Sequence, residues 1–201
     1  MRKHPAGGGF TLLELMVGVS IFGILLAVSI PPLVRSMDTQ SSANQAGAVA
    51  SRLRLARSQS LNAFSDVIVY FNRDGAGTYT VHVDNGGGSG TPADVNFDAA
   101  NRNNGQVDAN EPVFQPVRLD ERLVFGYVVG AKTAGGDFLH APISFAGTPQ
   151  RLVFHADGTA SETGWISVMP LQDFLDQDPG REFLVEVNSS TGEIEVHVTE
   201  H

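Results

Sequence analysis

The chain has 201 residues, 42% of them apolar, and its 13 Lys/Arg against 22 Asp/Glu give a formal net charge of −9. It contains no cysteine, which excludes disulfides and any site built on a thiol or a cysteine-bound metal. The acidic balance disfavours nucleic acid as a partner, because binding DNA or RNA requires Lys and Arg to neutralise phosphates.

The first predicted element is a membrane-spanning helix over residues 10–34. Glu14 is the only ionisable side chain in this apolar run, which follows Arg2 and Lys3 and precedes Arg35. At about 1.5 Å per residue the helix reaches roughly 37 Å, more than the roughly 30 Å of a bilayer's hydrocarbon core. The run is therefore long enough to cross a membrane once.

Glu14 is the exceptional residue of this helix. A carboxylate in a membrane helix costs roughly 2.5 to 3.5 kcal/mol on insertion scales, so such residues usually have a partner and a function. A cleavable secretory signal would place small residues after its apolar run, whereas the glycines at 7–9 come before it. The alternative is an ordinary signal anchor whose acid reaches the nearby membrane surface.

The segment Gly9-Phe-Thr-Leu-Leu-Glu14 resembles the class III signal of type IV prepilins and type II secretion pseudopilins. The resemblance implies that residues 1–9 are a leader peptide, that a prepilin peptidase cleaves between Gly9 and Phe10, and that Phe10 is then N-methylated. It also implies that Glu14 guides assembly and that Pro31 loosens the helix. The chemistry agrees, because the Glu14 carboxylate can pair with the freed amino group of a neighbouring subunit, which offsets the desolvation of both charges.

Pro31 and Pro32 predict a kink or local melting of the helix, or alternatively its end at the membrane surface, because each lacks a backbone donor and clashes with the preceding turn. Beyond them, residues 35–64 are predicted to continue as an amphipathic helix that covers a sheet. Arg54 and Arg57 are expected to be solvated or to face neighbouring subunits. The apolar stripe consists of Met37, Ala46, Val49, Ala50, Leu53, Ala56, Leu61 and Phe64.

Residues 65–201 are predicted to form one β-rich globular domain, large enough to have its own core. No helix is expected after Phe64, so antiparallel sheets are favoured over a doubly wound parallel sheet. The predicted fold class is α+β, with a long N-terminal helix packed on antiparallel sheets in a pilin-like β-sandwich. Runs rich in Val, Ile, Phe and Thr predict strands at residues 66–72, 78–83, 117–129, 143–145, 151–155, 165–169, 182–188 and 193–198.

Residues 84–116 are predicted to form a long polar loop without regular structure. Its second half partly matches a calcium loop, in which Asn104, Asp108 and Glu111 would stand at ligand positions. Ala100 and Arg102 occupy two positions where further ligands are required. The sequence therefore favours an Asn/Gly-rich surface turn and no cofactor, with a calcium site as the alternative.

The C-terminal part of the chain resembles GspH/FimT-type pseudopilins. The similar stretches are Leu-Val-Phe-His-Ala-Asp157-Gly158-Thr159-Ala160, then Gly164-Trp-Ile-Ser-Val, then Gly192-Glu-Ile-Glu-Val. The resemblance implies a minor pseudopilin, a structural subunit of the type II secretion pseudopilus that supports filament assembly and protein export across the outer membrane. The expected partners are other pseudopilins or pilins, the prepilin peptidase and the inner membrane. The expected location is a single pass of the inner membrane with the C-terminal domain in the periplasm, and then the filament.

Two other functions are less well supported by the sequence. The six histidines are scattered and the common hydrolase, metalloprotease and nucleotide-binding motifs are absent, so the protein is not expected to be an enzyme. The alternative is a FimT-like minor type IV pilin that takes part in pilus assembly or DNA uptake. DNA binding by such a pilin is disfavoured here, because residues 65–201 carry 7 Lys/Arg against 20 Asp/Glu.

Overall fold

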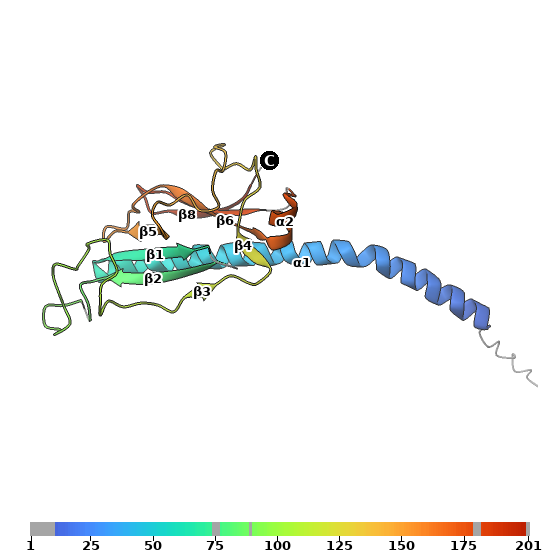
Figure 1. Cartoon of the computed structure of the whole chain (residues 1–201), viewed down its shortest axis with the longest axis horizontal. Coiled ribbons are helices and arrows are strands. Elements are labelled where there is room, and N and C mark those ends of the chain that lie inside the picture. Colours follow the sequence, from blue (N-terminus) through green and yellow to red (C-terminus); the bar gives the residue numbers. More distant parts are fainter. Residues whose placement is uncertain (1–10, 74–76, 89, 179–181, 200–201) are drawn as a thin grey trace, which may run out of the picture. The chain divides into compact units, whose positions relative to one another are not determined.

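The computed structural model describes residues 11–73, 77–88, 90–178 and 182–199 (Figure 1). The chain divides into two compact units, residues 1–38 and 39–201. Helix α1, Leu12–Ala63, begins in the first unit and ends in the second. Thr11 caps its start, because the Thr11 hydroxyl accepts a hydrogen bond from the Glu14 N–H at 3.2 Å.

Pro31 and Pro32 lie inside α1 and do not interrupt it. The local melting and the helix end considered from the sequence are therefore not observed. A proline's fixed φ is compatible with a helix, and the two missing N–H groups remove only the bonds to the carbonyls of Ala27 and Val28. The hydrogen-bonded turns on either side hold the helix together across this gap.

The later part of α1, in the second unit, carries the buried stripe of the amphipathic segment. Beyond Ala56 the stripe continues through Ser60, which is buried, whereas the predicted members Leu61 and Phe64 are exposed, as is Met37. Phe64 follows the last helical residue with a φ of 51°, so its side chain leaves the helical repeat. The members of the stripe that are buried as predicted are Ala46, Val49, Ala50, Leu53 and Ala56.

Within the described residues, eight strands form two four-stranded antiparallel sheets. The first sheet has the order β3-β2-β1-β5, and its strands are β1 Asp66–Asn72, β2 Thr78–Asp84, β3 Val117–Arg118 and β5 Gln150–Phe154. The second has the order β4-β6-β7-β8, and its strands are β4 Leu123–Phe125, β6 Gly164–Pro170, β7 Phe183–Val187 and β8 Ile194–Val198.

One hydrophobic core joins the later part of α1 to both sheets. It contains Leu53 of α1, Phe71 of β1, Leu152 of β5, Ile166 of β6 and Val185 of β7, each fully buried. Burying such side chains contributes roughly 1.5 to 3 kcal/mol each, which compensates for the missing disulfides. The predicted α+β class, a long N-terminal helix packed on antiparallel sheets, is confirmed.

Two strand predictions were wrong, and one short helix was not predicted. The run at 117–129 is not one strand, because a turn at Asp120 separates β3 from β4 and sends them to different sheets. The run at 143–145 forms only an isolated bridge between Ile143 and Ile166. A short helix that the sequence did not predict, α2 at Leu171–Asp176, directly follows β6.

In the segment predicted as a loop at 84–116, Asp84 is the last residue of β2, and the described residues after it form no helix or strand but are tied to the first sheet. Isolated bridges join Val113 to His82 and Arg102 to Asn85. The Asp66 N–H donates to Asn103 Oδ1 at 2.7 Å, and Arg151 donates to the Gly105 carbonyl at 2.6 Å. The loop is therefore packed on the end of β1, β2 and β5.

Candidate functional site

The helix of the first unit presents an apolar surface on every side. Among its described residues, Leu13 is 73% exposed and Phe22 66% exposed, and none of the apolar stretch is buried by the rest of the protein. By length and composition α1 can cross a membrane. An uncovered apolar helix of this length requires lipid or other helices around it.

Glu14 lies in the first turn of α1 and its side chain is exposed. A carboxylate there interacts favourably with the positive end of the helix dipole, by roughly 0.3 to 1 kcal/mol. Of the other predicted site residues in this unit, Pro31 lies within α1, while Gly9 and Phe10 lie outside the described residues.

A shallow apolar hollow lies about one turn after Glu14. Gly18 and Gly23 have no atom within 4 Å of an added Cβ, and the hollow has a volume of about 400 Å³. Small residues let a neighbouring helix approach closely, which is the usual basis of packing between membrane helices. The hollow is lined by Gly18, Val19, Phe22, Gly23 and Leu26.

The three candidate calcium ligands contact the loop itself. Glu111 is only 6% exposed, and its two carboxylate oxygens accept hydrogen bonds from the N–H groups of Gly86 and Asp108, both at 3.0 Å. Asn104 donates to Asp108 at 2.6 Å. Within the described ranges, no group of three His, Cys, Asp or Glu residues is arranged to hold a metal ion. Glu111 is therefore buried and holds two parts of the loop together through hydrogen bonds, whereas the sequence predicted a surface turn here.

Asp84, at the end of β2, is a second buried carboxyl group in this region. One oxygen accepts the Gly105 N–H at 2.7 Å, and the other has no hydrogen-bond partner among the described residues. Burial raises the pKa of Asp84 from 3.8 to about 6, the Gly105 hydrogen bond opposes this rise, and the Glu111 carboxylate adds to it. No local pattern in the sequence indicated the burial of Asp84, because this burial depends on how the loop packs.

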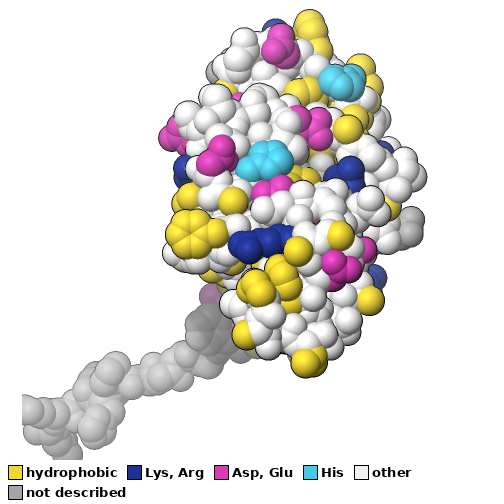
Figure 2. Space-filling model, turned by 90° about the vertical axis from the view of Figure 1, so that its left-hand side faces the viewer, with side chains coloured by type: hydrophobic (Ala, Val, Ile, Leu, Met, Phe, Trp, Pro, Cys, Tyr) yellow, Lys and Arg dark blue, Asp and Glu magenta, His cyan; other side chains and the backbone are white. Residues whose placement is uncertain are grey.

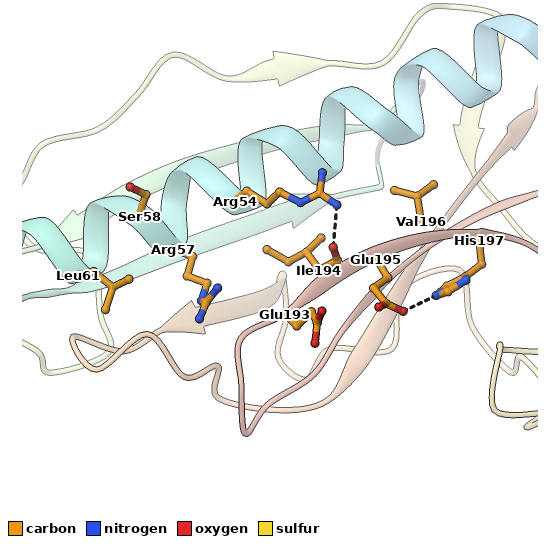
Figure 3. A pocket seen from close by; sticks show the side chains of 9 residues that line it. All are labelled: Arg54, Arg57, Ser58, Leu61, Glu193, Ile194, Glu195, Val196 and His197. Atoms are coloured by element: carbon orange, nitrogen blue, oxygen red, sulfur yellow. Dashed lines mark hydrogen bonds and ion pairs between the residues drawn. The ribbon is translucent and has the colours of Figure 1, made fainter.

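The later part of α1 and strand β8 enclose a groove of about 700 Å³ (Figure 3). Arg54 donates to the Ile194 carbonyl at 2.7 Å, and Arg57 donates to the Gly158 carbonyl at 2.9 Å. Both arginines thus contact the β-rich domain itself, whereas from the sequence they were expected to be solvated or to face neighbouring subunits. Their spacing beside buried Leu53 places both on the edge of the buried face. Glu193 and Glu195 line the opposite wall of the groove.

The surface charges of the second unit are mixed. Figure 2 shows acidic and basic side chains interspersed over one face, where the described Lys and Arg residues do not form a continuous stripe. The two arginines at the groove are engaged with backbone carbonyls and face two carboxylates. This arrangement is unlike the basic track that binds a phosphate backbone.

Comparisons with known proteins give two kinds of match. The family described as the prokaryotic N-terminal methylation motif matches residues 7–30. Two structures of the minor pseudopilin EpsH from the type II secretion system of Vibrio cholerae are similar at 13% and 15% identity, with TM-scores of 0.47 and 0.48. The matches cover 79% and 81% of this chain and 97% of each EpsH chain. No curated protein sequence matches. The chain carries a prokaryotic N-terminal methylation motif, on the segment where the sequence predicted it.

Proposed function

We propose that this protein is a minor pseudopilin, a structural subunit of a type II secretion pseudopilus that supports filament assembly and protein export. Residues 10–34 hold it in the inner membrane with the β-rich domain in the periplasm. A prepilin peptidase removes residues 1–9 by cleavage between Gly9 and Phe10, and Phe10 is then N-methylated. The subunit subsequently enters a filament with other pseudopilins.

The methylation motif carries this proposal. It lies at the start of a helix whose apolar surface is uncovered, and a domain with its own core follows. Cleavage after Gly9 leaves the apolar helix on the mature protein, so the helix is available to pack with other helices. Burial of this surface among like helices supplies the driving force for assembly.

Glu14 supplies the register of that packing. An unpaired carboxylate at membrane depth is costly, and pairing it with the free amino group of Phe10 in a neighbour removes much of that cost. The hollow at Gly18 and Gly23 begins about one turn further along, and in this proposal it accepts a side chain of the neighbouring helix. Together they favour one axial position of the neighbour over others.

The first experiment is an intact-mass measurement with N-terminal fragmentation. The full chain is expressed in a host with and without a prepilin peptidase and recovered from membranes. We expect a form that begins at N-methylated Phe10 only when the peptidase is present. A Gly9→Val variant is the matched control, and it should stay uncleaved because its branched side chain crowds the cleaved bond. An unprocessed wild-type chain, or cleavage beyond residue 34, would refute the proposal.

A second experiment distinguishes the secretion machine from a type IV pilus. In the native host, deletion of the gene should abolish export of secreted enzymes across the outer membrane, and restoring the full chain should recover it. Normal export with loss of pili or DNA uptake would instead assign the chain to the FimT-like group. The mixed and mostly engaged charges around Arg54 and Arg57 weigh against direct DNA capture.

A further inference from the structure

Strand β8, the last described strand, forms one edge of the second sheet and pairs only with β7. The bonds from Asn188 N–H to the Glu193 carbonyl and from Thr199 N–H to the Glu182 carbonyl show that residues 193 and 199 face β7. Because antiparallel pairing alternates, the backbone groups of Ile194, Val196 and Val198 point away from the sheet. These are the groups that an additional strand would use.

In the part of the chain that the structure describes, the first of these outward residues, Ile194, has a hydrogen-bond partner outside the sheet. Arg54 donates to the Ile194 carbonyl at 2.7 Å. Among the described residues, no group pairs with the outward N–H of Val196 or of Val198. Within the described chain, the edge of β8 is therefore open at Val196 and Val198.

The edge strand of the first sheet, β5, differs from β8 because its outward backbone groups are paired. There, the Arg151 N–H bonds the Ala146 carbonyl at 3.0 Å, and the Val153 carbonyl accepts the Ser161 N–H at 2.8 Å. The chain's own loops thus cover the edge of β5, which is the usual way of preventing unwanted pairing. Strand β8 has the same length and lacks such a cover within the described chain.

The two faces of β8 have opposite chemistry. On the core-facing side, Ile194 is buried, while Val196 and Val198 are 38% and 54% exposed. Side chains alternate along a strand, so these three valine and isoleucine side chains form one apolar row that emerges from the core. Val196, in the exposed part of the row, lines the groove beside α1, at the opposite end of that groove from Leu61 (Figure 3).

The other face is acidic. Glu193 and Glu195 line a second groove of about 310 Å³, together with Asp137, Glu186 and Trp165. No Lys or Arg is among the described residues that line it. Glu195 lies directly opposite Glu186 in the β7–β8 ladder, and like charges in such a pair repel. His197 Nε2 is 3.1 Å from Glu195 and 3.9 Å from Glu186.

We propose that the open edge of β8 accepts a β-strand from a partner protein in which apolar and basic residues alternate. The partner's backbone pairs with Val196 and Val198, its apolar side chains extend the row over the groove beside α1, and its basic side chains neutralise Glu193 and Glu195. Backbone pairing supplies the affinity and the two faces supply the selectivity. The inference goes beyond the proposed filament role, since its test requires neither a peptidase nor a filament.

The test measures binding of labelled eight-residue peptides to the full chain in detergent micelles by fluorescence anisotropy. The probe alternates Val and Lys, and two control peptides are an alternating Val–Glu peptide and a Val–Lys peptide N-methylated at every amide. N-methylation keeps the side chains and charges but removes the backbone donors. We expect saturable binding of the Val–Lys peptide, with binding of both control peptides at least about tenfold weaker.

The charge-reversal variant Glu195→Lys tests the location. It should weaken binding of the Val–Lys peptide about tenfold and strengthen binding of the Val–Glu peptide, because attraction across the strands becomes repulsion. Glu121→Lys is the matched control, since Glu121 is exposed in the turn before β4, at the opposite edge of the second sheet. Unfolding curves from the fluorescence of Trp165, the sole tryptophan, verify that both variants are folded.

Three results would overturn the proposal. The first is no saturable binding of the Val–Lys peptide up to about 1 mM. The second is equal binding of the N-methylated peptide, which would mean that attraction is electrostatic and needs no strand pairing. The third is an equal effect of Glu195→Lys and Glu121→Lys, which would place the peptide elsewhere on the acidic surface.

Discussion

Arg54 Nη2 lies 2.7 Å from the carbonyl oxygen of Ile194, a residue 140 positions later in the chain. Arg57 makes a similar bond to the carbonyl of Gly158, so one flank of α1 is attached to the last described strand and to a turn of the β-rich domain. Among the described residues, no strand supplies a donor to either of these two carbonyl groups. The two arginines therefore replace pairing partners at two places where the sheets end.

We predict that Arg54→Met lowers the free energy of unfolding of the domain by about 1 kcal/mol. Methionine keeps an apolar stem but leaves the Ile194 carbonyl without its donor. The measurement is urea unfolding of the full chain in detergent, followed by Trp165 fluorescence. Arg52→Met is the control, because Arg52 is equally exposed but lies beside Tyr79, on the flank of the helix away from Ile194. Equal destabilisation by both variants would show that the Ile194 bond contributes little.

The sequence was informative where one local pattern decides the structure. The apolar run with its single acid at Glu14 indicated the membrane helix, and the spacing from Ala46 to Ala56 indicated the buried stripe. Both are local patterns that can be read within a short stretch of the chain. Most strand positions also followed from β-branched and aromatic runs, whereas the pairing of the strands did not. Contacts such as Arg54 to Ile194, or the burial of Asp84, depend on segments far apart in the chain, and no local pattern encodes them.

Asn103 offers a test of how the long loop is held. Its side chain accepts the Asp66 N–H at 2.7 Å, and its backbone has a φ of 54°, which Asn tolerates better than most residues. We expect Asn103→Ala to destabilise the loop by about 1 to 2 kcal/mol and to speed limited proteolysis within residues 84–116. Asn101→Ala should leave the cleavage rate unchanged.

A second variant at the same position separates the two contributions. Asn103→Gly loses the hydrogen bond but adopts a positive φ without strain. If the hydrogen bond dominates, the Gly and Ala variants are cleaved equally fast. A glycine variant as resistant as the wild type would show instead that only the backbone conformation matters at this position.

Asp84 should make the stability of the domain depend on pH. Its pKa in the folded protein, about 6, exceeds the ordinary 3.8, so the folded state binds more protons between about pH 4 and 6. This carboxyl group therefore lowers the free energy of unfolding as the pH rises through that window, and its unfavourable contribution persists above it. The cause is the burial of a charge that forms at the higher pH.

The variant Asp84→Asn stays neutral and can still accept the Gly105 N–H. We expect the free energy of unfolding of this variant to equal that of the wild type near pH 4. Above pH 7 it should be higher than that of the wild type by on the order of 2 kcal/mol. Urea unfolding at several pH values measures the difference. Burial lowers the pKa of His82 and raises the pKa of Glu182. Both groups are present in the wild type and in the variant, so their contributions largely cancel in the difference. A difference independent of pH would refute the assignment to Asp84.

The function of Glu14 is best tested by separating its charge from its shape. We predict that Glu14→Ala is still cleaved and retained in the membrane, since removing the acid lowers the cost of insertion by roughly 2.5 to 3.5 kcal/mol. Its incorporation into filaments should fall at least about tenfold, because the amino group of a neighbour loses its partner. Immunoblots of sheared filaments against the membrane pool give the ratio.

The isosteric Glu14→Gln variant decides between the two properties. If the carboxylate charge guides docking, Gln fails to assemble as severely as Ala, although it keeps the shape and the hydrogen bond from the Glu14 backbone to Thr11. Ser20→Ala, two turns further along the same exposed helix, should assemble normally. Normal incorporation of Glu14→Ala would eliminate an assembly role for this residue. The acid would then be an anchor charge that the first helical turn tolerates because the helix dipole stabilises it.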